Sequence, residues 1–214
     1  MRTLLAAVTL LLAAPFLAAC GDDGDTTATD PGGTPTAGTN PMPSEIPAAP
    51  GTVHTNGLAT VLDRGAGAGG PQLCLGPVAE SWPPQCTGQP VQGWDWSDHH
   101  GVFERQGRIR WGQFAVTGTW DGATFGYHDA IAAALYDPMP TETVTYPDPA
   151  VVHTAAELEN IATDVGDLPG TQGVYVDAGH VLVDVVYDDG TLQAWADRAY
   201  GKAVVVVRSA LLDG

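Results

Sequence analysis

The stretch RIRWGQFAVTGTW, residues 108–120, decides the fold of the middle of the chain. Its apolar side chains alternate with polar ones, as they do along a β-strand that buries one face. The apolar residues before and after Gly112 have opposite parity: Ile109 and Trp111 before it, and Phe114, Val116 and Trp120 after it. Because successive side chains point to opposite faces, this change of parity indicates a bulge or a sharp bend at Gly112.

Bent strands that serve two faces are typical of small β-barrels. Asp121 and Gly122 follow as a hairpin turn signal, and three apolar-rich segments precede the stretch: 58–62, 71–76 and 91–96. We therefore expect residues 53–135 to form a β domain. A small, partly open barrel of the OB type is the favoured form, and a two-sheet sandwich is the alternative.

Residues 153–214 show a different pattern. Thr154 and Glu157 form a capping-box sequence ahead of apolar residues at helical spacing. Two strands follow around Ala178 and Gly179, then a second helix that ends at Gly201, and finally the apolar run 203–207. An apolar run of this kind predicts a central strand that is buried on both faces. The order α-β-β-α-β resembles part of a ferredoxin-like sandwich, so the fold class is α+β. A right-handed crossover predicts that the last strand lies parallel to the strand at 181–187.

The chain begins with a secretory signal. Arg2 precedes an apolar stretch from Leu4 to Leu17, which is shorter than the roughly 20 residues that a membrane-spanning helix needs. Residues 17–20, Leu-Ala-Ala-Cys, resemble the lipobox of bacterial lipoproteins. The resemblance implies that residues 1–19 are removed and that Cys20 becomes a lipid-modified N-terminus. Several acyl chains on one residue would anchor the protein in the membrane.

Two segments look like connections. Residues 20–52 are rich in Gly, Thr, Pro, Ala and Asp, and we expect a disordered, lipidated tether because they offer too little apolar area for a core. Residues 136–152 are rich in Pro and Thr without periodicity, and we expect a linker.

Cys74 and Cys86 are the two cysteines left after Cys20. In an oxidising compartment an even pair is expected to form a disulfide. A zinc site needs about four closely spaced ligands, and a catalytic thiol needs a base partner and a reducing setting. Neither pattern is present in the sequence, so we predict a disulfide bond and neither a metal nor a cofactor.

The motifs LCLG, ESWPPQC, GWDW and VTGTWDG occur in this order over residues 58–122. They resemble a group of small secreted or lipidated proteins from high-GC Gram-positive bacteria. The resemblance implies that Cys74 and Cys86 are a structural pair and that the protein is exported. It implies no activity and no catalytic residue.

Charge narrows the range of partners. The chain carries 8 basic and 25 acidic residues, a formal net charge of −17. Such a surface repels the phosphates of nucleic acids and the head groups of anionic lipids. We therefore predict no nucleic acid partner. The membrane is reached through Cys20 alone, and the remaining candidate partners are a wall glycan, a small ligand or another envelope protein.

The most suggestive polar stretch is WDWSDHHG, residues 94–101. Trp94 and Trp96 could stack on a ligand, and His99 and His100 could bind it, although a core role for the tryptophans and a surface loop for the histidines are the simpler interpretations. The serines of the folded part do not occur in a G-x-S-x-G motif. We therefore predict a non-catalytic binding or accessory module. The alternatives are an envelope hydrolase that uses His99 or His100, and a structural subunit for a protein partner.

Overall fold

The computed structural model describes residues 40–138 and 144–214. The predicted signal peptide, Cys20 and the first part of the predicted tether lie outside these residues. These described residues belong to one compact unit. No helix in the described ranges combines the length and the apolar character needed to cross a membrane.

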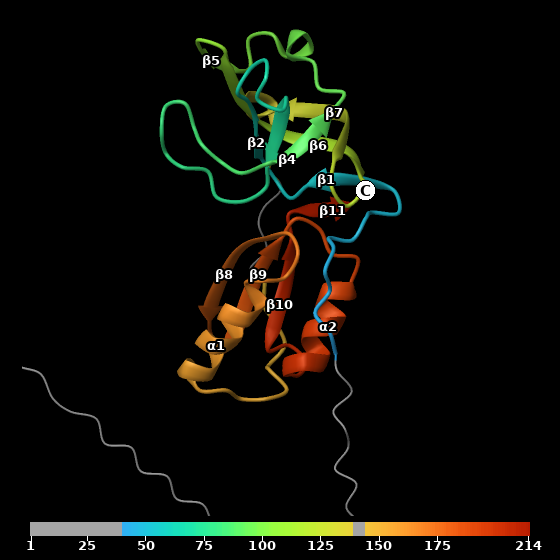
Figure 1. Cartoon of the computed structure of the whole chain (residues 1–214), viewed down its shortest axis with the longest axis vertical. Coiled ribbons are helices and arrows are strands. Elements are labelled where there is room, and N and C mark those ends of the chain that lie inside the picture. Colours follow the sequence, from blue (N-terminus) through green and yellow to red (C-terminus); the bar gives the residue numbers. More distant parts are fainter. Residues whose placement is uncertain (1–39, 139–143) are drawn as a thin grey trace, which may run out of the picture. The chain divides into compact units, whose positions relative to one another are not determined.

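A closed barrel of five strands forms the first part of the fold (Figure 1). Its strands, in order around the barrel, are β6 (Ile109–Trp120), β2 (Ala59–Asp63), β3 (Pro71–Cys74), β4 (Gln89–Gln92) and β7 (Phe125–Ala132). β7 pairs back with β6 and closes the ring. All neighbours are antiparallel except β4 and β7, which are parallel. The predicted barrel is therefore confirmed, but it is closed rather than partly open.

Shorter elements complete this part of the chain. They are the strands β1 (Thr52–Thr55) and β5 (Glu104–Gln106), and the 3-10 helices η1 (Trp96–His99) and η2 (Ala133–Leu135). β1 and β5 each pair with the long strand β6 outside the ring. Strand β6, which is 12 residues long, therefore pairs with four other strands: β1, β2, β5 and β7.

The structure has no bulge at Gly112, so that form of the expected irregularity is wrong. The pairing of β2 with β6 runs without a shift from Ala59 opposite Phe114 to Asp63 opposite Arg110. The irregularity of β6 lies at Thr117 and Gly118, opposite β7.

The change of parity has another cause, because β6 buries side chains on both faces. Phe114, Val116 and Trp120 point into the barrel core. Trp111 packs on the outer face with Leu62 and Cys74. Gly112 lies under the ring of Phe114, where an added Cβ would come within 2.6 Å of the ring.

The second part of the fold is an α-β-β-α-β unit, as predicted. Its elements are α1 (Ala155–Val165), β8 (Thr171–Asp177), β9 (His180–Val185), α2 (Thr191–Tyr200) and β10 (Val205–Ser209). The capping box of Thr154 and Glu157 is formed. β10 pairs parallel with β9, which confirms the crossover prediction, and β8 pairs antiparallel with β9. Both helices pack on the sheet face that carries Val181, Val183 and Val185 (Figure 1).

The apolar run at 203–207 does not form the central strand. β9 is central, and β10 lies at an edge of the three-stranded sheet. The side chain of Gln193 in α2 covers that edge, since its amide donates to the carbonyl of Val205 and accepts from the N–H of Val207, both at 2.9 Å. A covered edge does not need polar residues to keep other strands away.

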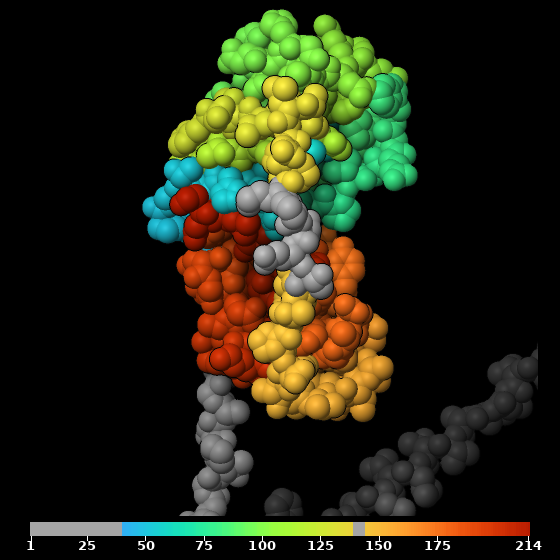
Figure 2. All heavy atoms as spheres, turned by 180° about the vertical axis from the view of Figure 1, so that it is seen from behind, coloured from blue at the N-terminus to red at the C-terminus, as the bar shows by residue number. Residues whose placement is uncertain are grey.

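Residues 144–152, within the predicted linker, lie against the second part. Figure 2 shows this segment in yellow, crossing the face of the unit seen from behind. The ring of Tyr146 packs against His180, and the N–H of Ala150 donates to the carbonyl of Lys202 at 2.9 Å. The segment is therefore fixed at two places.

Strand pairing and side-chain packing connect the two parts of the fold. The last strand, β11 (Leu211–Asp213), pairs with β1, and Leu211 joins the barrel core together with Tyr187. The hydroxyl of Tyr187 donates to Asp213 at 2.8 Å. Burial and the adjacent carboxylate raise the pKa of Tyr187 to about 12.

Residues 40–52, assigned above to the tether, contact the fold in the structure. The indole N–H of Trp195 donates to the carbonyl of Asn40, and that of Trp120 donates to the carbonyl of Pro47. These bonds are 3.1 and 2.9 Å long. The packed chain thus begins by residue 40, well before residue 53, where the sequence suggested the β domain starts.

Candidate functional site

The stretch WDWSDHHG divides between the interior and the surface. Trp94, Trp96 and His99 are buried, whereas His100 is exposed. The rings of Trp94 and His99 stack with their centroids 4.1 Å apart, and Trp94 also meets Phe114 and Tyr127 edge to face. Of the four residues predicted to bind a ligand, His100 alone presents its side chain to solvent. A binding role for the four stays a prediction.

Trp96 belongs to a polar network inside the barrel. The buried carboxylate of Asp63 accepts hydrogen bonds from the indole of Trp96 at 3.0 Å, from the guanidinium of Arg110 at 2.7 Å and from the N–H of Gly65 at 2.8 Å. Arg110 also lies over the ring of Trp96, 5.5 Å from its centroid. A carboxylate satisfied in this way is a structural group.

His99 lacks the contacts of a general base. Its Nε2 is buried and has no hydrogen-bond partner among the described residues. Burial lowers the pKa of His99, and the nearby carboxylates of Asp98, Asp95 and Asp129 only partly oppose this effect. A hydrolytic His needs a hydroxyl nucleophile and an acid within hydrogen-bond reach.

The acidic residues of the stretch have local roles. Asp95 caps η1 by accepting from the N–H of Ser97 at 2.8 Å, and these bonds lower the pKa of Asp95. Within 40–138 and 144–214, the structure holds no group of three or more His, Cys, Asp or Glu side chains arranged to bind a metal ion.

The disulfide between Cys74 and Cys86 is present, with the two Cα atoms 6.0 Å apart. It closes residues 75–85, the disulfide loop, over the outer face of the barrel. Arg64 fastens one end of the loop, since its guanidinium donates to the carbonyl of Cys86 at 2.8 Å. A backbone bond from Ala79 to Gln85 holds the loop across its middle. The loop thereby forms a fixed wall.

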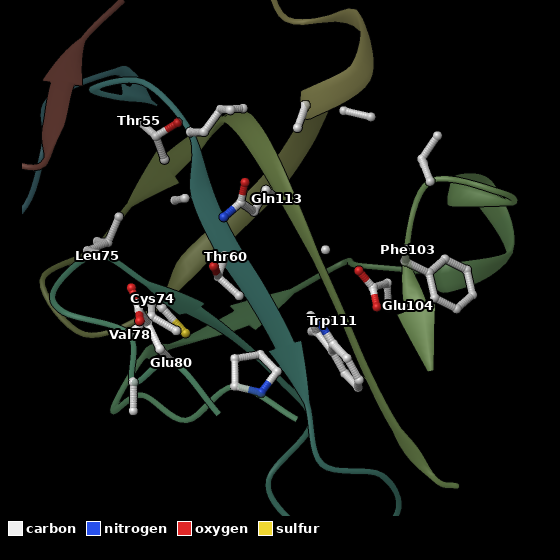
Figure 3. A pocket seen from close by; sticks show the side chains of 18 of the residues that line it. Thr55, Thr60, Cys74, Leu75, Val78, Glu80, Phe103, Glu104, Trp111 and Gln113 are labelled. Carbon is white, nitrogen blue, oxygen red and sulfur yellow. The ribbon is translucent and has the colours of Figure 1, made fainter. Parts of the chain in front are cut away.

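A hollow of about 910 Å³ lies between this wall and the outer face of β2 and β6 (Figure 3). We call it the outer hollow. Thr60 pairs across the strands with Cys74 on one side and Gln113 on the other, so these three side chains share the outer face. Trp111 pairs with Glu104 of β5 in the same way. The strand register therefore assembles the floor of the hollow from residues far apart in the sequence.

Two tryptophans provide the aromatic surface of the outer hollow. Trp82 belongs to the disulfide loop and is 65% exposed, whereas Trp111 is only 6% exposed. Their rings meet edge to face with centroids 5.0 Å apart and planes at 89°. Trp111 therefore packs against Trp82, most of whose surface is exposed to solvent. A large aromatic side chain held rigidly in an exposed position is a feature of binding surfaces.

The polar residues that line the outer hollow are either acidic or uncharged. Glu80 and Glu104 are the only charged side chains among the lining residues, which include no Lys, Arg or His. Thr60 is 7% exposed and is one of the lining residues. The hollow therefore offers carboxylates, a hydroxyl and an amide beside an aromatic ring.

The sequence contains a partial signal for this site. Trp82 and Trp111 both lie within the predicted β domain, but alternation alone does not show which tryptophans of that domain are exposed. Glu80 begins the ESWPPQC motif, which was interpreted only as part of a structural pair of cysteines. Glu104 belongs to no motif, and only the register of β5 and β6 brings it beside Trp111.

Comparisons with models of protein families, with curated proteins and with solved structures found no match for this chain.

Proposed function

We propose that this protein is an exported, lipid-anchored binding module that holds a sugar of the cell envelope in the outer hollow. The observation that carries the binding role is the exposed Trp82, fixed against Trp111 at the mouth of a hollow with polar floor residues. Sugar rings stack on such aromatic faces while their hydroxyls bond to neighbouring carboxylates and amides.

The anchor is supported by the sequence. The short apolar stretch and the Leu-Ala-Ala-Cys ending at Cys20 resemble a bacterial lipoprotein signal. The remainder of the chain would lie on the extracytoplasmic face of the cell membrane, where the disulfide between Cys74 and Cys86 is stable. The motif resemblance to exported proteins of high-GC Gram-positive bacteria agrees with this location.

The finer fold assignment is also a proposal. The barrel order β2-β3-β4-β7-β6, with a single parallel pair between β4 and β7, supports the OB type. The second unit would be a ferredoxin-like sandwich that lacks one strand, since β9 and β10 pair directly. In OB barrels the strand faces and adjoining loops commonly bind oligosaccharides or oligonucleotides, and the net charge of −17 disfavours the latter.

The two alternatives predict different sites. A hydrolase that uses His99 or His100 would turn over ester or peptide substrates and lose activity in His99→Gln or His100→Gln. A structural subunit would bind an envelope protein through an apolar surface and would ignore sugars.

Two experiments test the proposal. Mass spectrometry of protein purified from membranes should find Cys20 as an acylated N-terminus, and an intact leader with a free Cys20 thiol would contradict the anchor. Isothermal titration with chitin-type oligosaccharides, both acetylated and deacetylated, should detect binding that Trp82→Ala reduces about tenfold or more. If neither oligosaccharide binds, the proposed function is wrong.

A further inference from the structure

We infer that the outer hollow selects an amino sugar whose nitrogen is a free ammonium group rather than an N-acetyl group. The inference rests on the proposed function and names the ligand class of the same site. It starts from the charge of the lining, which is acidic without any basic side chain.

The two glutamates are available to a ligand. Glu80 and Glu104 are both exposed, and neither forms an ion pair within the described parts of the chain. By contrast, the carboxylates of Asp63 and Asp184 are each bound by an arginine. The hollow therefore attracts cations and repels phosphorylated or carboxylated sugars.

The register places Glu104 where an ammonium would also meet an aromatic ring. Glu104 is the Cα partner of Trp111 in the antiparallel pair of β5 and β6, so their side chains project from the same face as neighbours. Figure 3 shows the carboxylate of Glu104 beside the indole of Trp111. An ammonium held by the carboxylate would gain a cation–π contact in addition to the ion pair.

The rest of the hollow suits the ring and hydroxyls of a sugar. Trp82 is 65% exposed, so its ring is accessible for stacking. Thr60 and Gln113 are cross-strand partners that project side by side from β2 and β6 (Figure 3). Thr60 lines the hollow with only 7% of its surface exposed, so its hydroxyl is placed to form a hydrogen bond with a ligand that enters.

The combination distinguishes an amino sugar from simpler ligands. A small inorganic cation would use the glutamates but not the face of Trp82. A neutral acetylated sugar would use Trp82, Thr60 and Gln113 but leave both carboxylates without a counter-charge. A deacetylated glucosamine unit matches the aromatic, neutral and acidic groups together.

The test compares two probes of equal length that differ in charge. Binding of the glucosamine tetramer and of the N-acetylglucosamine tetramer is measured by isothermal titration with the full chain, at low and at high salt. We expect the deacetylated tetramer to bind about tenfold more tightly. Raising the salt concentration should weaken the binding of the deacetylated probe selectively.

Variants separate a site from general attraction to an acidic protein. Glu104→Gln and Glu80→Gln should each weaken the glucosamine tetramer about fivefold or more and leave the acetylated tetramer unchanged. Glu159→Gln, which removes an equally exposed charge from α1, should change neither. Trp82→Ala should weaken both probes.

Each other outcome overturns the inference in a recognisable way. Equal binding of both tetramers, lost in Trp82→Ala, would leave the proposed function intact and reject charge selection. An effect of Glu159→Gln as large as that of Glu104→Gln would show nonspecific attraction. Binding of a trilysine peptide as tightly as the glucosamine tetramer, and equally sensitive to Glu104→Gln, would show recognition of an ammonium without a sugar.

Discussion

The inner and the outer tryptophans of the barrel have opposite roles. Trp94 and Trp96 lie in the barrel core, where His99, Phe114 and Asp63 surround them. Trp82 and Trp111 lie on the outer face, where the disulfide loop supports one of them at the edge of a hollow. In the sequence the inner pair is the more noticeable, because it adjoins two aspartates and two histidines.

The comparison shows that a dense polar and aromatic motif is not by itself a binding site. The polar atoms around Trp96 satisfy one another, and Asp95 caps η1. The glutamates of the outer hollow have no such partner among the described residues. What separates the two regions is whether their carboxylates are already bonded within the protein, since Nε1 of Trp94 and Nε2 of His99 in the inner cluster have no hydrogen-bond partner among the described residues.

The largest expected difference is in stability. Trp94→Ala should lower the free energy of unfolding by about 3–5 kcal/mol, because it empties a packed interior position. Trp82→Ala removes a side chain that is 65% exposed and should cost less than about 1 kcal/mol. Urea unfolding followed by circular dichroism measures both, and Trp94→Phe serves as a milder control. Equal losses for the two alanine variants would mean that the inner and outer assignment is wrong.

The second effect concerns the wall of the outer hollow. Replacing Cys74 and Cys86 by alanine should destabilise the fold by about 3 kcal/mol, since the bond links cysteines with a sequence separation of 12. It should also weaken sugar binding, because the wall that holds Trp82 loses its covalent end. Wild-type protein with the bond reduced provides the control without a change of side chain. A reduced protein that binds as the oxidised form does would separate the disulfide from the site.

The smallest effect is a pH dependence of the inner cluster. Because burial lowers the pKa of His99 in the folded state, the unfolded state binds more protons once the pH falls below about 6.5. Stability should therefore decrease as the pH falls through this range, with a slope of at most about 1.4 kcal/mol per pH unit from this residue. His99→Gln should remove that part of the slope. An NMR titration of His99 that gives a pKa above 6.5 would contradict the burial argument.

Local chemistry made part of the fold predictable. The capping box of Thr154 and Glu157, and the parallel pairing of β10 with β9, follow from short sequence patterns and from the handedness of crossovers. The disulfide follows from the number of cysteines and the expected compartment. These predictions depend on neighbours in sequence or on general rules.

The sequence-based predictions that failed depend on contacts between segments that are distant in the sequence. Alternation around Gly112 shows which side chains share a face, but not that a loop covers the outer one. The apolar run at 203–207 does not reveal that Gln193 would cover the edge of β10. The outer hollow depends on both kinds of information, since the pairing of Glu104 with Trp111 and the position of Trp82 each need the tertiary fold.

Tryptophan footprinting tests the central claim most directly. The full chain is oxidised briefly with and without the glucosamine tetramer, and modification at each tryptophan is read by mass spectrometry. Without the tetramer, Trp82 should react fastest and Trp94 and Trp96 slowly, and the tetramer should protect Trp82. Protection of Trp94 or Trp96 with no change at Trp82 would place the ligand in the inner cluster and contradict the account.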